Sequence, residues 1–337
     1  MVKIVPFRSF FFEYNRRGCI KFTRQSECPV FRLRMKVGAY GCCILLHSQR
    51  LRHLAHSCYE VFVYLCAMKT IRQLFVFALL AILLTGCEIF DYHPYDTRVK
   101  GKHNINAQNI ARIEAACAGR DSLRFVLISD TQRWYDETKA AVRSINARGD
   151  IDFVIHCGDI SDFGVTKEFE LQRDILEKLQ MPYVVLLGNH DCLGTGADTY
   201  RYIFGNPNFA FNAGNTHFLC INTNAFEYDY STAVPDFGYI RTDRENLLAG
   251  IERSVVAMHA QPTSEQFNNN VSDLFQYEIK KYPALAFCMC GHGHQTQVND
   301  LFGDGTLYYE CAAAKKREYI VFTLKKDGGY THEVIQY

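Results

Sequence analysis

The sequence predicts a mixed α/β fold with a β-rich C-terminal half. Short apolar runs alternate with helical segments in the order β-α-β-α-β between residues 125 and 187. The strand-like runs are apolar without interruption, which is typical of parallel strands that helices cover on both faces of a sheet. From residue 307 to 334 the pattern instead favours antiparallel strands.

The individual elements follow from these patterns in chain order. A short amphipathic helix is predicted over residues 107–118, where apolar side chains recur at helical spacing. The later elements are a strand over 125–128, a helix over 137–148, a strand over 153–155, a helix over 167–179, a strand over 183–187, and further strands over 217–222, 254–258 and 284–289.

The charge of the chain is divided unevenly between its two ends. Residues 1–67 hold 11 Lys or Arg against 3 acids, whereas residues 87–337 hold 24 against 33, a net charge of −9. Because a surface of that sign repels the phosphate backbone, no nucleic-acid partner is expected. Hydrophobic residues make up 48% of the chain, so a sizeable core is expected without covalent bridges, and we assign no disulfide.

A targeting signal is predicted to begin at Met68. Lys69 and Arg72 precede an uninterrupted apolar run over residues 74–84, which is followed by Thr, Gly and then Cys87. This order resembles a bacterial lipoprotein signal, in which the cysteine thiol is acylated and becomes the mature N-terminus. A helix over this run spans roughly 16 Å, about half the hydrocarbon thickness, so we interpret it as a signal and not as a membrane span.

Four segments follow from this interpretation. Residues 1–67 show no sustained helical or strand period, and we expect them to be an upstream extension from a start codon assigned too early. A basic arm for anionic lipid or nucleic acid is the alternative for them. Residues 68–86 would be the signal peptide, 87–106 a tether and 107–337 the folded domain. The protein would be lipid-anchored at Cys87 to a bacterial membrane, facing the periplasm or the cell exterior.

Polar side chains follow five of the predicted strands at their carboxyl ends, where open α/β sheets bind ligands. They are Asp130, Gln132, Asp159, Asn189, His259, His292 and His294. Carboxylate oxygen, amide oxygen and imidazole nitrogen are ligands for Mn, Fe, Zn and related divalent ions. Seven such groups are too many for one tetrahedral ion and suit two ions that share a bridging carboxylate.

These blocks, in this order, resemble those of the calcineurin-like metallophosphoesterases over residues 125–313. The resemblance implies a two-sheet β-sandwich flanked by helices, with a dinuclear metal centre. One ion would be held by Asp130, Gln132, Asp159 and His294, and the other by Asp159, Asn189, His259 and His292, with Asp159 as the bridge. His190 would face the substrate and stabilise or protonate the leaving oxygen.

Gln132 departs from the commonest form of the first motif, which has His two residues after Asp. Some members of the family carry Gln there, among them proteins similar to the manganese-dependent ADP-ribose/CDP-alcohol diphosphatases. An amide oxygen is a harder ligand than imidazole, so manganese is the expected ion, with iron, zinc and magnesium as alternatives. The opposite interpretation is that Gln132 weakens the first metal site and leaves a protein that only binds its ligand.

The expected activity is hydrolysis of a phosphoester or diphosphate bond by a hydroxide that bridges the ions. The expected substrate is a small nucleotide-like phosphate compound. A phosphomonoesterase or phosphoprotein phosphatase is the enzymatic alternative, and a noncatalytic envelope-tethered receptor for phosphate compounds is the alternative of another class. No oligomeric state follows from the sequence.

Supporting roles are expected for residues beside the motifs. Asp162 either orients a ligand or caps the following helix, and Asp191 either hydrogen-bonds to His190 or serves a turn. The aromatic residues Phe226, Tyr228 and Tyr230 lie between the motifs and would either shape a pocket near the metals or pack in the core.

Overall fold

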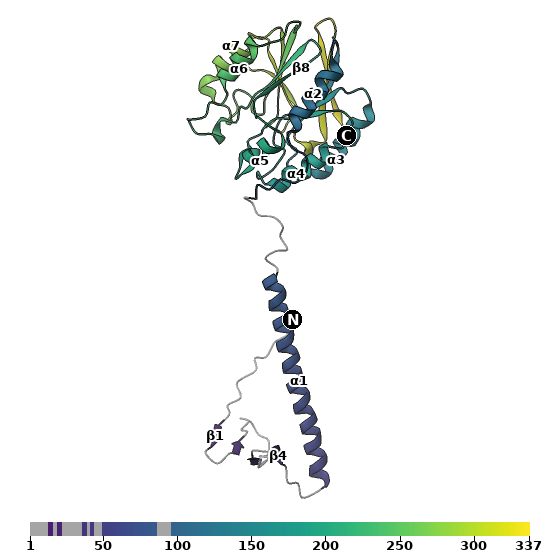
Figure 1. The fold of residues 1–337 in the computed structure, drawn as a ribbon, viewed down its shortest axis with the longest axis vertical. Coiled ribbons are helices and arrows are strands. Elements are labelled where there is room, and N and C mark those ends of the chain that lie inside the picture. The colour runs from purple at the N-terminus through teal and green to yellow at the C-terminus, as the bar shows by residue number, and fades with distance from the viewer. Residues whose placement is uncertain (1–12, 16–18, 22–35, 39–40, 44–48, 86–95) are drawn as a thin grey trace. The chain divides into compact units, whose positions relative to one another are not determined.

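The computed structural model describes residues 13–15, 19–21, 36–38, 41–43, 49–85 and 96–337 (Figure 1). The chain divides into two compact units, Met1–Phe90 and Asp91–Tyr337. Cys87 and residues 88–95 of the predicted tether lie outside the described residues. The fold that concerns function is therefore that of the second unit.

The described part of the first unit holds two short hairpins and one long helix. β1 (Glu13–Asn15) pairs with β2 (Cys19–Lys21), and β3 (Lys36–Gly38) pairs with β4 (Gly41–Cys43), both antiparallel.

Helix α1 runs from Gln49 to Thr85 and passes through Met68 without a break. Residues 49–67 are thus helical although their sequence shows no sustained helical period. Within α1, the segment Tyr59–Leu80 is long and apolar enough to cross a membrane, judged by length and composition alone. Signal sequences pass the same test, so length and composition do not distinguish a signal peptide from a membrane-spanning helix here.

The second unit contains two sheets. The five-stranded sheet consists of β5 (Leu123–Ile128), β6 (Phe153–His156), β7 (Tyr183–Val185), β14 (Glu318–Leu324) and β15 (Tyr330–Gln336). The six-stranded sheet consists of β8 (Phe209–Ala213), β9 (Thr216–Cys220), β10 (Arg253–Ala257), β11 (Leu285–Cys290), β12 (Gln297–Asp300) and β13 (Leu307–Glu310). Their strand orders are β15-β14-β5-β6-β7 and β12-β13-β11-β10-β9-β8.

Each sheet has a run of parallel strands; antiparallel strands flank it on both sides in the six-stranded sheet and on one side in the five-stranded sheet, where β7 is a parallel edge strand. β5, β6 and β7 are parallel, as are β9, β10, β11 and β13. β8, β12, β14 and β15 each pair antiparallel with a neighbour. The expectation of an antiparallel tail over residues 307–334 is thus correct for β14 and β15 and wrong for the pairing of β13 with β11.

The main core lies between the two sheets, because alternate side chains of each strand point to the same face. Phe125 stacks on Phe153 with ring centroids 5.1 Å apart. Both rings also make edge-to-face contacts with Phe218, which lies in the other sheet. This interdigitation of large buried rings fixes the spacing of the sheets.

Helices cover the outer face of each sheet, as the two further apolar clusters show. α3 (Tyr135–Arg148), α4 (Thr166–Leu176) and α5 (Gly196–Ile203) pack on the five-stranded sheet, whereas α6 (Phe237–Glu245) and α7 (Ser272–Ile279) pack on the six-stranded sheet (Figure 1). Short 3-10 helices are η2 (His190–Cys192), η3 (Ala225–Glu227), η4 (Asn269–Val271) and η5 (Ala314–Lys316). The predicted two-sheet sandwich flanked by helices is confirmed.

Helix α2 (Ile105–Cys117) covers the edge strands β7 and β8. Asn106 Nδ2 donates to Val185 O (2.8 Å), and Val185 N donates to Asn106 Oδ1 (2.9 Å). Asn109 Nδ2 donates to Tyr183 O (2.8 Å). Two side-chain amides thus supply β7 with the pairing that another strand would give, which satisfies an otherwise open sheet edge.

The described end of the predicted tether is bound to the domain. Lys100 N donates to Glu170 Oε1 (2.6 Å), and Arg173 Nη1 donates to Lys100 O (2.6 Å), so residues 96–104 lie against α4. The folded domain therefore begins earlier than residue 107.

The cysteines of residues 96–337 are free thiols, and all are buried except Cys192, which is partly buried. Burial raises the pKa of each buried thiol, to about 11 at Cys117 and further at the others. They act as small apolar side chains of the core.

Replacing Asn106 tests the role of α2 at this edge. Asn106→Ala leaves the buried Val185 N–H without its acceptor, so we expect a loss of about 1 to 3 kcal/mol in the free energy of unfolding. Gln108→Ala, on the exposed side of the same helix, should change the free energy of unfolding by less than about 0.5 kcal/mol. Urea unfolding of the two variants measures both values, and equal midpoints would contradict the edge role.

Candidate metal centre

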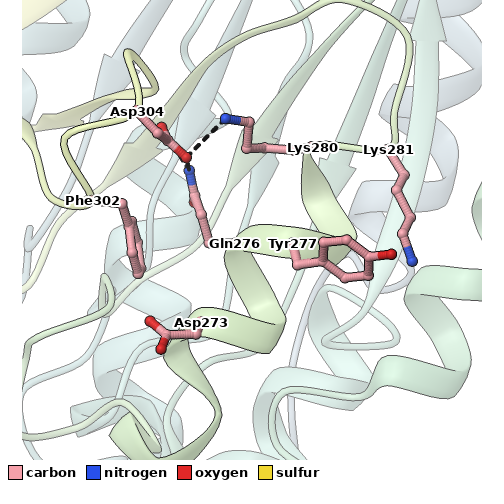
Figure 2. Close-up of a pocket in the computed structure, with 7 residues that line it drawn as sticks. All are labelled: Asp273, Gln276, Tyr277, Lys280, Lys281, Phe302 and Asp304. Carbon is pink, nitrogen blue, oxygen red and sulfur yellow. Dashed lines mark hydrogen bonds and ion pairs between the residues drawn. The ribbon is translucent and has the colours of Figure 1, made fainter.

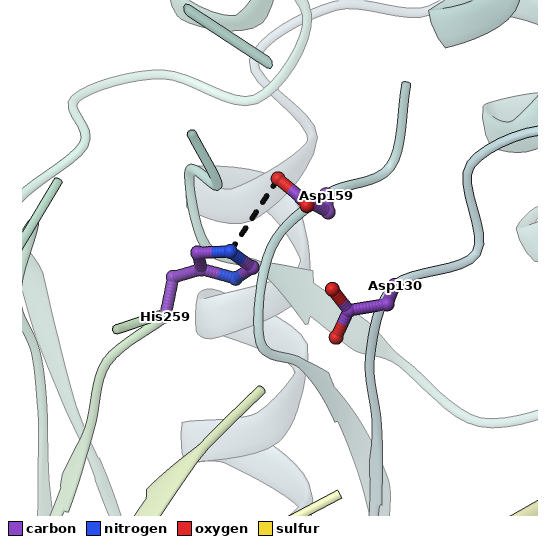
Figure 3. Close-up of side chains that lie close together, drawn as sticks. All are labelled: Asp130, Asp159 and His259. Carbon is purple, nitrogen blue, oxygen red and sulfur yellow. Dashed lines mark ion pairs between the residues drawn. The ribbon is translucent and has the colours of Figure 1, made fainter. Parts of the chain in front are cut away.

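The predicted ligands lie at the carboxyl ends of the parallel strands. Asp130 follows β5, Asp159 follows β6, Asn189 follows β7, His259 follows β10, and His292 and His294 follow β11. Asp130, Asp159 and His259 are buried and bring one ligand atom each within 4.8 Å of one another (Figure 3). Residues from both sheets therefore meet at one rim.

One group of ligand atoms surrounds the side chain of Asn189. Its Oδ1 lies 3.0 Å from His259 Nε2 and 3.0 Å from His292 Nδ1. His259 Nε2 also lies 3.4 Å from Asp159 Oδ1. These four residues are the set that the resemblance assigned to one ion.

The protonation of His259 suits a metal ligand. Its Nδ1 lies 2.7 Å from Cys157 O and donates to that carbonyl, so the lone pair of Nε2 faces the rim. Burial lowers the pKa of His259 to about 4, although the charge of Asp130 opposes the shift. The ring is therefore neutral at neutral pH, which is the form that binds metals.

A second group of ligand atoms surrounds Asp130. Its Oδ1 lies 3.1 Å from His294 Nε2 but receives no well-aligned hydrogen bond from the described residues. Gln132 Nε2 lies 3.3 Å from Asp159 Oδ2, and a half-turn of this amide would present its oxygen instead. Asp159 thus has one oxygen in each group. The buried Asp130 Oδ1, which receives no well-aligned hydrogen bond from the described residues, fits a cation site.

The electrostatics of the two carboxylates also favour a cation. Burial and the charges of Asp130 and Asp191 raise the pKa of Asp159 well above its ordinary value. Burial also acts to raise the pKa of Asp130, but the contact with His294 and the charge of His259 outweigh it and lower that pKa. A divalent ion placed between the two carboxylates would offset this repulsion, so the donor set fits the two ions that the resemblance implies.

The backbone is left-handed at most of the predicted ligands. Positive φ angles occur at Asp130 (51°), Gln132 (35°), Asp159 (57°), His292 (72°) and His294 (60°). Such conformations cost roughly 1 to 3 kcal/mol each in residues other than glycine and are found where the surrounding structure enforces them. Here they turn side chains at the strand ends toward a common point. Gly188 is required beside them, because a Cβ there would lie 2.1 Å from Asp159 N.

His190 lies at the rim and is held through Asp162. Its Nδ1 donates to Asp162 O (2.7 Å), and its Nε2 lies 4.0 Å from Asp159 Oδ2 with the side chain 36% exposed. The Asp162 carboxylate pairs with Arg133 at 2.8 Å. Asp162 does not cap α4, because Glu168 accepts the N–H groups of the loop before that helix. The helix-cap role is therefore excluded, and the expected role of Asp162 in orienting a metal ligand stays a prediction.

Asp191 joins two ligand-bearing loops and does not bond to the His190 imidazole. Its Oδ1 accepts from Ser161 N and Ser161 Oγ, both at 2.8 Å. Its Oδ2 accepts from Gly188 N at 2.9 Å and from Ile160 N at 3.3 Å. The expectation that Asp191 supports His190 by a side-chain hydrogen bond is therefore wrong, and its role is to hold together the loops after β6 and β7.

Two acidic residues beside the rim were not predicted. Glu265 Oε1 lies 2.9 Å from His292 Nε2, and Glu310, at the end of β13, is buried and accepts from Gln297 Nε2 at 2.6 Å. Glu265 lies in a polar loop without a motif, so no sequence signal distinguished it. The position of Glu310 at a strand end is the one signal that could have found it.

Comparisons with known proteins bear on the family of this chain. A family model described as calcineurin-like phosphoesterase matches residues 123–296. A 3′,5′-cyclic-nucleotide phosphodiesterase of Nostoc sp. (strain PCC 7120) is 26% identical over 188 residues, 52% of this chain and 66% of that protein. The uncharacterized protein YvnB of Bacillus subtilis (strain 168) is 25% identical over 221 residues, 55% of this chain and 16% of that protein. The chain thus spans less than two thirds of the length of either relative.

Among solved structures, a dimetal phosphatase from Danio rerio has a TM-score of 0.49 at 13% identity, covering 64% of this chain and 99% of that one. The family model matches more than half of the chain, over the strands and loops that carry the rim. The chain therefore belongs to the calcineurin-like phosphoesterase family.

Proposed function

We propose that this protein is a metal-dependent hydrolase of small organic phosphoesters. The observation that carries the proposal is the position of Asp159 between two groups of ligand atoms. Its Oδ1 lies 3.4 Å from His259 Nε2 in one group, and its Oδ2 lies 3.3 Å from the Gln132 amide in the other. Two ions held there would lower the pKa of a water and neutralise charge on the phosphoryl oxygens.

The chain's own residues supply orientation and a proton. The Asp162 carbonyl accepts the His190 Nδ1–H, which fixes the orientation of the ring. His190 Nε2 then faces the rim and can give a proton to the departing oxygen. The amide and carboxylate oxygens among the ligands favour manganese, with iron, zinc or magnesium as the other ions to compare.

The substrate class is proposed from two observations. The Nostoc relative is named as a cyclic-nucleotide phosphodiesterase, which supports an ester of a nucleotide-like compound. The net charge of −9 over residues 87–337 disfavours a polymeric nucleic acid.

We further propose that the protein is anchored in the cell envelope through a lipid on Cys87. The basic start at Met68, the apolar run over residues 74–84 and the small residues before Cys87 support this.

Asp159→Asn tests the metal centre. The purified chain is stripped of metal and reloaded with Mn, Mg, Zn or Fe, and hydrolysis of bis-p-nitrophenyl phosphate and p-nitrophenyl phosphate is compared. We expect manganese-dependent turnover that falls at least about 100-fold in Asp159→Asn, together with loss of bound ions measured by metal analysis. Asp136→Asn, an exposed acid of α3, should retain both. Two ions still bound to Asp159→Asn would refute the bridge.

His190→Ala separates proton transfer from metal binding. We expect the variant to keep its ions and to lose about 100- to 10,000-fold in kcat, because no group remains to protonate the leaving oxygen. His103→Ala serves as the control, since His103 is an exposed residue that stacks on Tyr202. Unchanged kcat in His190→Ala would remove His190 from the mechanism.

Cys87→Ser tests the anchor. Growth with a labelled fatty acid should label the unaltered protein, and the variant should carry no label and leave the membrane fraction. Equal labelling of the two proteins would exclude a lipid on Cys87.

A further inference from the structure

A large cavity lies between two loops of the second unit. It has a volume of about 820 Å³ and is lined by residues of the segments 225–237 and 265–271. Such a volume is within the usual range for sites of small organic ligands.

Both loops are attached to the predicted metal centre. Glu265 lines the cavity, and its Oε1 lies 2.9 Å from His292 Nε2. On the other loop, Asn224 Nδ2 donates to Leu187 O (2.9 Å), just before the segment that carries Asn189. The neighbouring Thr223 Oγ1 accepts from Ala260 N, next to His259. The cavity wall therefore continues directly from the ligand-bearing loops.

The two loops are also bonded to each other. Ala225 N donates to Gln266 O (2.8 Å), and Gln266 Nε2 donates to Glu227 Oε1 (3.2 Å). Asn269 folds its own loop, since its side chain accepts from Thr263 N (2.8 Å) and donates to Ser264 O (2.7 Å). The cavity is thus a built feature with walls fixed in relation to the rim.

The lining is aromatic and carries negative charge. Phe267 is buried against Phe275, with ring centroids 5.3 Å apart, whereas Phe226 is 74% exposed and Tyr230 is fully exposed. The charged residues of the lining are Asp229 and Glu265, and no Lys, Arg or His of the described part of the chain lines this cavity. Exposed rings offer flat faces to a ligand, while the carboxylates repel a second anionic group.

We propose that this aromatic cavity binds the organic group of the phosphoester and selects a flat, uncharged aromatic ring. The proposal rests on the proposed function, because the phosphate is taken to lie at the predicted metal centre. Phe226 and Tyr230 are the residues whose exposed rings stack on the substrate. The cavity would therefore disfavour substrates whose organic group carries a further phosphate or carboxylate.

A second pocket provides the matched control. It measures about 460 Å³ and is lined by Tyr277, Lys280, Lys281 and Asp304, among others (Figure 2). Lys280 pairs with Asp304 at 2.9 Å, and Lys281 Nζ lies 3.9 Å from the ring centre of Tyr277. Its lysines are thus engaged within the pocket, and Tyr277 is an exposed tyrosine that makes no part of the aromatic cavity.

The test uses three phosphodiesters with one common leaving group. The full chain, loaded with manganese in detergent, is given the p-nitrophenyl esters of methyl, phenyl and 4-carboxyphenyl phosphate. We expect the KM of the phenyl ester to be about tenfold lower than that of the methyl ester, because the phenyl ring stacks on the exposed rings. The carboxylate of the 4-carboxyphenyl ester should abolish this advantage. The double variant Phe226→Ala/Tyr230→Ala should fold normally and lose the preference for phenyl over methyl. Tyr277→Ala should behave as the unaltered chain.

A binding measurement separates this proposal from the proposed function. Equilibrium dialysis of diphenyl phosphate against the chain in EDTA reports occupancy without turnover. Weaker binding in the double variant than in Tyr277→Ala supports the cavity proposal even if no ester is hydrolysed. A lack of hydrolysis would overturn only the proposed activity. Equal binding in both variants, or a phenyl preference that survives in the double variant, would overturn the cavity proposal.

Discussion

Two carboxylates buried side by side are the constraint on which the rim depends. Asp130 and Asp159 are almost inaccessible to water, so their charges repel each other in a medium that screens poorly. Main-chain groups hold each of them: His292 N donates to Asp130 Oδ2 at 3.1 Å, and His190 N donates to Asp159 Oδ1 at 2.9 Å. The backbone is left-handed at Asp130, Asp159 and His292, so backbone strain and charge repulsion coincide at the predicted cation sites.

The surrounding structure keeps this arrangement rigid without contributing ligands. Asp191 spans the loops after β6 and β7 with four hydrogen bonds, and Gly188 leaves no room for a side chain between them. The stacked phenylalanines between the sheets fix the distance from the five-stranded sheet to the six-stranded sheet. Since His259 and Asp159 come from different sheets, that distance also sets the geometry of the rim.

Much of the fold and the rim could be predicted because the signals are local. Asp130, Asp159 and Asn189 each follow an apolar strand directly, and parallel strands place their ends together. The strands β8 and β12 and the helices α5, α6 and α7 were not predicted, because each is only four to nine residues long and gives a short signal. The partners of Asp191 and Glu265 lie about 30 residues away along the chain, and only the packed loops bring them together. Likewise, nothing in the local sequence shows that Asn106 pairs with the edge of β7.

The buried thiols have a consequence for the chemistry of the folded chain. Cysteines react as thiolates, and burial raises the pKa of Cys157, Cys220 and Cys290 so far that almost none is ionised at neutral pH. Electrophiles and oxidants therefore meet a native domain that is nearly inert, while an opened molecule exposes several reactive sulfurs at once. The cysteines of the sandwich act as an internal reporter of conformational opening, readable by alkylation and mass spectrometry strand by strand.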